Sequence, residues 1–264
     1  MFERLFDIPL VIAGPAIIAG LCVFGVAGLL LVRRWILPRL RIQAEDSEFV
    51  GAMIQCVMVF YGLAVALIAV NVWQTYSNVQ SVVAGEASAL DALYRDVSSY
   101  PEPIRLELQE NLRTYTDQII HGAFPLMRRG QTPTAGFAYM TRFQAILDKF
   151  EPVTEGQKIL HAETLRAYNL LIEARRLRLD AASACLPTVM WIVIIVGGCI
   201  SLTTSFFVKI EDARLHAIMV MLLAGFMGLV IFMTFAFDRP FRGDLGIDPQ
   251  PYQLIYDRLK NSKP

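Results

Sequence analysis

The stretch that decides the fold is FVGAMIQCVMVFYGLAVALIAVNVW at residues 49–73, in which no Asp, Glu, Lys or Arg occurs. Three other stretches share this property. A helix of about 20 apolar residues crosses the roughly 30 Å hydrocarbon core of a bilayer. The sequence therefore predicts an all-α integral membrane protein with four transmembrane helices, at 8–32, 49–73, 186–208 and 217–237.

The composition fits a membrane protein and excludes several other classes. Of the 264 residues 55% are hydrophobic and 18% are charged, against about 25% charged in soluble domains. The 24 basic and 24 acidic residues cancel, so the chain has no basic field to attract nucleic acid. The four cysteines form no CxxC pair and the three histidines are scattered, which predicts neither a metal site nor a cofactor. The first apolar stretch follows MFERLFD, which is not a basic signal-peptide region, so we expect it to remain as an anchor.

The order of segments predicts a helical cap between spans two and three, because its apolar residues recur three and four apart. A first cap helix continues span two until Pro101 and Pro103 end it, and a second runs towards Pro125. A loop at 130–136 precedes a third helix, and a fourth is expected to run straight into span three. The expected domains are transmembrane helices 1 and 2 at 1–76, the extramembrane helical region at 77–184, transmembrane helices 3 and 4 at 185–237, and a polar C-terminal tail at 238–264.

One carboxylate lies on an apolar face of the first cap helix. Glu86 shares a face with Val82 and Leu90, and a buried carboxylate needs a partner. On the fourth helix Arg176 lies close to the stripe of Leu165, Ile172 and Leu179. We therefore expect an ion pair between Glu86 and Arg176, whose role is either to fix the register of the two helices or to act in catalysis or ion gating.

Span two is the most plausible pore-lining helix. One of its faces carries small or polar residues while bulky residues occupy the others. The same pattern also suits tight packing between helices, so both interpretations stand. The pore-lining candidates are Gln55, Gly62, Ala66, Ala69 and Trp73.

Charge returns abruptly at the end of span four, in FDRPFRGD at 237–244, where Pro240 terminates the helix. The carboxylate of Asp238 opposes the helix dipole there, so we expect it to contact a basic group such as Arg239 or Arg242. The motif is either an interfacial stop signal or an ion-attracting vestibule.

Three runs together resemble the bestrophin-like domain family of bacterial membrane proteins. They are GEASALDALYRDVSSYPEPIRLELQENLRTY at 85–115, EARRLRLDAASACLPTVMW at 173–191 and DRPFRG at 238–243, and their order relative to the four spans extends the resemblance over nearly the whole chain. The resemblance implies no established catalytic role. It marks as signature positions Glu86, Tyr94, Arg95, Tyr115, Arg176, Pro187, Trp191, Asp238, Arg239, Pro240 and Gly243.

The family name implies a relation to bestrophins, which are pentameric anion channels with four spans and a cytosolic helical region between spans two and three. By this resemblance Phe60 and Tyr61 would supply the aromatic pore neck, whereas no cluster of Asp and Glu supplies the calcium clasp. The resemblance also implies a bacterial inner membrane location, a cytoplasmic cap and cytoplasmic termini. The positive-inside rule argues the other way, because the two short loops carry Arg33, Arg34, Arg39, Arg41, Lys209 and Arg214.

The sequence thus favours a homo-oligomeric ion channel, anion-selective, with the lipid bilayer, inorganic ions and further copies as its partners. The alternative is a non-conducting scaffold or sensor that binds a partner through its cap. A membrane enzyme is the least supported class, because nothing pairs a nucleophile with a base. An enzyme would require a pocket that holds Glu86 together with His121 or His161.

Overall fold

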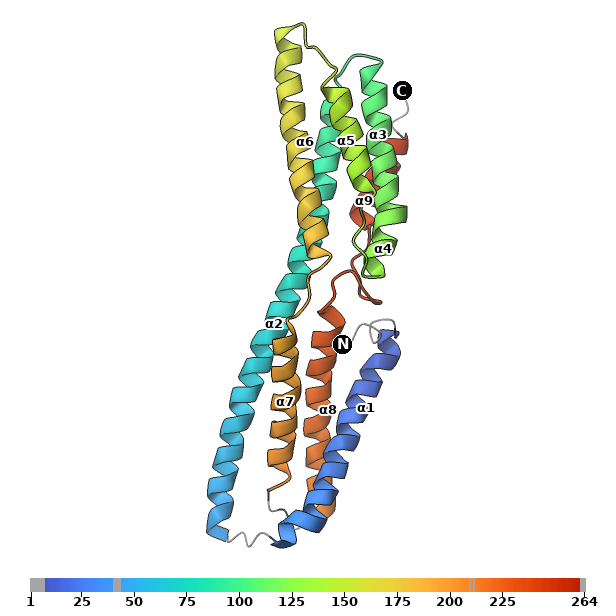
Figure 1. Ribbon diagram of the computed structural model, residues 1–264. Coiled ribbons are helices and arrows are strands. Elements are labelled where there is room, and N and C mark those ends of the chain that lie inside the picture. The colour runs from blue at the N-terminus through green and yellow to red at the C-terminus, as the bar shows by residue number, and fades with distance from the viewer. Residues whose placement is uncertain (1–7, 40–43, 209, 211, 262–264) are drawn as a thin grey trace. The chain divides into compact units, whose positions relative to one another are not determined.

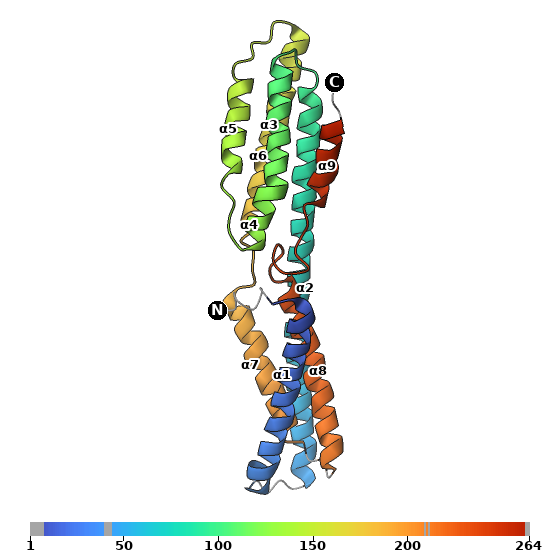
Figure 2. The same ribbon diagram turned by 90° about the vertical axis from the view of Figure 1, so that its right-hand side faces the viewer.

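The computed structural model describes residues 8–39, 44–208, 210 and 212–261, and its regular elements are all helical (Figures 1 and 2). The chain divides into two compact units. Met1–Gln74 with Cys185–Asp238 form the first, here called the span unit, and Thr75–Ala184 with Arg239–Pro264 form the second, here called the cap unit. The long helix α2, Ala44–Val97, contributes to both units.

The span unit contains α1 (Leu10–Leu31), α7 (Thr188–Ser205), α8 (Ala213–Phe237) and the first part of α2. A π-helical turn, η2 (Val32–Ile36), and a 3₁₀ turn, η3 (Leu37–Arg39), follow α1. Among the described residues four helices are long and apolar enough to cross a membrane, which confirms the predicted all-α fold with four spans. The chain is therefore a multi-pass membrane protein.

Glycines hold the spans close together. A Cβ atom added at Gly28 of α1 would lie 2.7 Å from the Phe206 ring, and one at Gly228 of α8 would lie 3.0 Å from the Cα of Ile18. A side chain at Gly28 would displace the Phe206 ring, and one at Gly228 would push the α1 backbone at Ile18 by a few tenths of an ångström, so both glycines favour close helix contact. Leu29, Leu202, Val220 and Ala224 fill the space between α1, α7 and α8.

The cap unit packs the second part of α2 with the other extramembrane helices. These are α3 (Ile104–Gln118), the π-helical turn η4 (Ile119–Ala123), α4 (Phe124–Arg128), α5 (Gly136–Leu147), α6 (Glu155–Ala181) and α9 (Gln250–Asn261). Its core is aliphatic and aromatic, with Leu90, Leu112, Phe143 and Leu171 each fully buried. Thr154 and Gln157 form a capping box that starts α6.

The structure corrects one connection. The fourth cap helix does not run straight into span three, because α6 ends at Ala181 and α7 begins at Thr188. Pro187 lies immediately before α7, and its ring removes a backbone donor and restricts the residue before it. The C-terminal tail, for which the sequence predicted only polarity, contains α9, whose Tyr252, Ile255 and Leu259 are buried in the cap unit.

Candidate functional site

The predicted pore-lining face of span two is only partly exposed on the surface of the protomer. Gln55, Gly62 and Ala66 are exposed, whereas Ala69 is buried and Trp73 packs edge-on against Phe237 with ring centroids 5.2 Å apart. The buried side of this part of α2 consists of Val65, Ile68, Ala69 and Val72. The face predicted to line a pore is therefore exposed from Gln55 to Ala66. It is in contact with other residues of the protomer at Ala69 and Trp73.

An apolar groove runs between α2 and α8 within the span unit. Gly62 and Ala66 line it on the α2 side, and Leu223, Phe226 and Val230 line it on the α8 side. A Cβ atom added at Gly62 would meet nothing within 4 Å, so this glycine is not required by a contact inside the protomer. The groove is open space beside two of the predicted pore-lining residues.

The two neighbouring aromatic residues of span two, Phe60 and Tyr61, have different surroundings. Tyr61 lies at a contact with α7, where its hydroxyl donates a 3.0 Å hydrogen bond to the Ile194 carbonyl and its ring covers Gly197. Phe60 is 73% exposed. Of the two residues that the resemblance assigned to a pore neck, Tyr61 is thus occupied in packing inside the protomer.

The cap unit contains a fully buried ion pair, which corrects the predicted partner of Glu86. The guanidinium of Arg178 donates to both carboxylate oxygens, over 2.5 Å from Nε to Oε2 and 3.2 Å from Nη2 to Oε1. Arg176 is exposed. The buried stripe of α6 is Thr164, Tyr168, Leu171 and Arg178, rotated by one residue from the stripe that the sequence suggested.

Two tyrosines complete the surroundings of this pair. The Tyr115 hydroxyl of α3 donates a 2.9 Å hydrogen bond to Glu86 Oε1, and Met127 Sδ lies 3.6 Å from Arg178 Nη1. Tyr252 of α9 is fully buried, and burial together with the Glu86 carboxylate holds its pKa well above the ordinary value. The pKa of Tyr115 is raised for the same two reasons. Residues of α2, α3, α6 and α9 therefore share one buried polar cluster.

Neither histidine named in the enzyme hypothesis joins Glu86. His121 Nδ1 lies 3.0 Å from Asp117 Oδ1, and the Tyr100 hydroxyl lies 2.9 Å from His161 Nδ1. Among the described residues no group of three or more His, Cys, Asp or Glu side chains could hold a metal ion. The buried cluster itself holds one ion pair and two tyrosines.

The motif after span four divides between the two units. In the span unit the buried carboxylate of Asp238 accepts a 2.6 Å hydrogen bond from the Leu186 N–H, just before α7. In the cap unit Pro240 is buried and its carbonyl accepts a hydrogen bond from the Ile247 N–H. Gly243 has φ of +73°, a conformation that favours glycine. Asp238, Pro240 and Gly243 thus each contribute to the conformation of the segment that follows α8.

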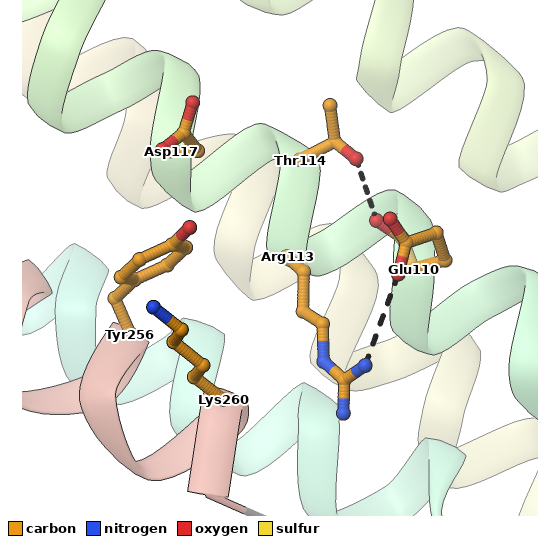
Figure 3. Close-up of a pocket in the computed structure, with 6 residues that line it drawn as sticks. All are labelled: Glu110, Arg113, Thr114, Asp117, Tyr256 and Lys260. Atoms are coloured by element: carbon orange, nitrogen blue, oxygen red, sulfur yellow. Dashed lines mark hydrogen bonds and ion pairs between the residues drawn. The ribbon is translucent and has the colours of Figure 1, made fainter. Parts of the chain in front are cut away.

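A polar groove lies on the surface of the cap unit between α3 and α9 (Figure 3). Figure 3 shows Glu110, Arg113 and Thr114 on α3, with Arg113 directed towards Glu110. Tyr256 and Lys260 of α9 form the opposite wall. Acidic and basic side chains are mixed along this groove.

A model of the bestrophin-like domain matches residues 19–252. The chain belongs to the bestrophin-like domain family. No curated protein and no solved structure matches it.

Family membership confirms the resemblance on which the signature positions were chosen. Of these positions, Glu86 and Tyr115 meet in the buried cluster and Asp238 bonds to the start of span three. Sequence reasoning missed Arg178, which stands in the same basic run as Arg176, and Tyr252. Tyr252 could have been found from the spacing of Tyr252, Ile255 and Leu259, which marks the buried face of an amphipathic helix.

Proposed function

We propose that this bestrophin-like chain is one subunit of a homo-oligomeric ion channel, selective for anions, in a bacterial plasma membrane. The observation that carries the proposal is the exposed side chain of Gln55 inside a span with no charged residue. An amide that faces hydrocarbon without a hydrogen-bond partner costs about 2–7 kcal/mol. A neighbouring subunit or a water-filled passage removes this cost.

Further copies are needed for conduction, because the four spans of one protomer do not easily surround a wide aqueous path. The surface of α2 in the cap unit supports such a path as well. Its exposed residues include Ser77, Ser81 and Ser88, whose hydroxyls suit a wetted surface. Arg129 is exposed in the same unit and favours anions over cations, whereas Arg128, also exposed, is paired with the Asp248 carboxylate.

The orientation belongs to the same proposal. We place the cap and both termini in the cytoplasm, as the bestrophin relation implies. The arginines at 33, 34 and 39 oppose this placement under the positive-inside rule. Labelling of a cysteine at Leu106, which is 45% exposed on α3, by a membrane-impermeant thiol reagent in intact cells separates the two orientations. Labelling without permeabilisation would reverse the proposed topology.

Flux into liposomes that carry the purified protein tests conduction. We expect chloride flux that exceeds sodium flux, and a changed rate or selectivity in Gln55→Leu and Trp73→Ala. Asn71→Leu is the matched control, because Asn71 is an exposed amide on the same helix but about 160° around its axis from Gln55. Equal effects of the two amide replacements would remove Gln55 from the conduction path. Absence of flux from folded, assembled protein would end the channel proposal.

The groove between α3 and α9 favours the second candidate, a scaffold or sensor that binds a partner through its cap. Four charged side chains line this groove, namely Glu110, Arg113, Asp117 and Lys260. A charge-reversing Lys260→Glu variant would weaken partner capture in a scaffold. The same change would leave ion flux intact in a channel that needs no partner.

A further inference from the structure

Another groove lies on the surface of the cap unit between α3 and α5, which run side by side (Figures 1 and 2). Its volume is about 300 Å³, at the lower limit of the roughly 300–1,000 Å³ of most ligand pockets. Its lining includes Leu106, Glu107 and Asn111 of α3 and Tyr139 and Arg142 of α5. On α3, Glu107 and Asn111 are one helical turn apart and share a face, as do Tyr139 and Arg142 on α5. A groove of this size suits a small molecule.

The buried amide of Asn111 lacks a hydrogen-bond donor. Asn111 is 6% exposed in the middle of α3, and its Oδ1 atom accepts no hydrogen bond from the described residues. Asparagine is a weak helix former, and a buried acceptor without a partner is rare in proteins. Helix propensity therefore does not explain this residue. A ligand with an N–H donor would supply the missing partner.

Two charges of opposite sign line the two sides of the groove. Glu107 lies on the α3 side and Arg142 on the α5 side, and both are exposed. Within the described part of the chain neither of them forms an ion pair. Glu110 differs, because its carboxylate lies 3.8 Å from Arg113 Nη1. A carboxylate and a guanidinium that line one groove without meeting can each bind the opposite charge of the same ligand.

We propose that this groove binds a free α-amino acid with an apolar side chain. The ammonium group of the ligand carries three N–H donors and donates to Glu107 and Asn111 Oδ1. The ligand carboxylate accepts two hydrogen bonds from Arg142, because the planar guanidinium matches its geometry. Leu106, which is 45% exposed, and the half-buried Tyr139 offer apolar surface to the ligand side chain. The inference goes beyond the proposed function and does not depend on ion conduction.

Equilibrium dialysis of the detergent-solubilised full chain against radiolabelled L-leucine tests this site. We expect saturable binding of one molecule per chain. Two labelled analogues each lack one charge, since L-leucinamide has no carboxylate and N-acetyl-L-leucine has no ammonium group. Each analogue should bind about tenfold or more weakly than L-leucine, because it loses a hydrogen bond between charged groups.

Substitutions assign each charge of the ligand to a residue. Arg142→Gln should weaken L-leucine about tenfold or more and leave L-leucinamide unchanged, because the amide has no carboxylate for Arg142 to bind. Glu107→Gln should weaken L-leucine and leave N-acetyl-L-leucine unchanged. Asn111→Leu should weaken L-leucine and L-leucinamide alike. Arg166→Gln is the matched control, because Arg166 is also exposed but lies on α6, outside the groove.

The outcomes separate binding in this groove from other causes. Saturable binding of L-leucine that falls in the groove variants but not in Arg166→Gln supports the proposal. Absence of saturable binding to the folded wild-type protein overturns it, as does an equal fall in Arg166→Gln. Equal affinity for the three compounds also overturns it, because the charges would then play no part. That comparison uses the wild-type chain, so it decides the proposal even where a variant fails to fold.

Discussion

Helix α2 belongs to both units, and the two parts of it are packed in different ways. In the cap unit the buried residues of α2 are exposed by 0% to 7%, and Leu90 and Leu93 are not exposed at all. In the span unit the buried residues of α2 are exposed by 4% to 9%, and Phe60 and Leu67 of the same helix are more than half exposed. The cap closes a core of its own, while the span unit leaves α2 to be covered by lipid or by other copies.

The two units also use different means of close contact. The cap unit is filled by large side chains around a buried ion pair, in the manner of a water-soluble domain. The span unit brings helix backbones together over glycines, as membrane helices do when no hydrophobic force drives them together. Substitutions should therefore act through a different mechanism in each unit.

The largest expected effect lies in the cap unit. Arg178→Ala leaves the Glu86 carboxylate buried and unpaired, which costs about 3–5 kcal/mol. We expect a marked fall in the melting temperature of the detergent-solubilised protein, followed by circular dichroism. Arg176→Ala is the matched control, because Arg176 is exposed two residues away and its loss should cost less than about 0.5 kcal/mol. Equal losses from the two variants would show that the ion pair does not hold the cap together.

A smaller effect is expected in the span unit. Gly28→Ala forces a methyl group against the Phe206 ring and should cost about 1–3 kcal/mol through overpacking. Gly20→Ala on the same helix is the control, because a Cβ atom there meets nothing within 4 Å. The measurement is the midpoint of thermal aggregation in a fixed detergent. If Gly28→Ala behaved like Gly20→Ala, the packing of α1 would not depend on its glycines.

The smallest effect at neutral pH concerns the two buried tyrosines of the cap. The pKa values of Tyr115 and Tyr252 are raised in the folded state, so their contribution to stability is complete below the unfolded pKa of about 10 and is lost as the pH rises towards the folded value. We expect the melting temperature of the wild-type protein to fall above about pH 10. Tyr252→Phe should reduce that fall. If the melting temperature of this variant fell as steeply above about pH 10 as that of the wild type, Tyr252 would not contribute to the pH dependence.

The fold was largely predictable because its determinants are local. Charge-free stretches give the spans, and the spacing of Leu108, Leu112 and Tyr115 gives the buried face of α3. The break before α7 was missed although Pro187 signals it. Proline is common in the first turn of a helix, so Pro187 is compatible with the start of a new helix. The sequence alone does not show that α6 has already ended at Ala181.

The candidate site was harder to predict because it depends on helix rotation. Within the run of arginines at 175–178, a rotation of one residue decides which guanidinium is buried, and Leu165 and Ile172 suggested the wrong stripe. The contribution of Tyr252 depends on α9 packing against α3, far away in the sequence. Whether Gln55 faces water depends on copies of the chain that one sequence does not place.

The hydrogen bond of Asp238 has a mechanical consequence for the span unit. It ties the end of α8 to the start of α7, and at the opposite ends of these helices the buried His216 donates a 3.1 Å bond from Nε2 to the Ser205 carbonyl. Because a hydrogen bond joins α7 and α8 at each end, we expect the two helices to move together as one rigid hairpin. In the proposed channel, we therefore expect any movement that widens the passage to occur between this hairpin and α2, which the Tyr61 hydrogen bond to Ile194 joins.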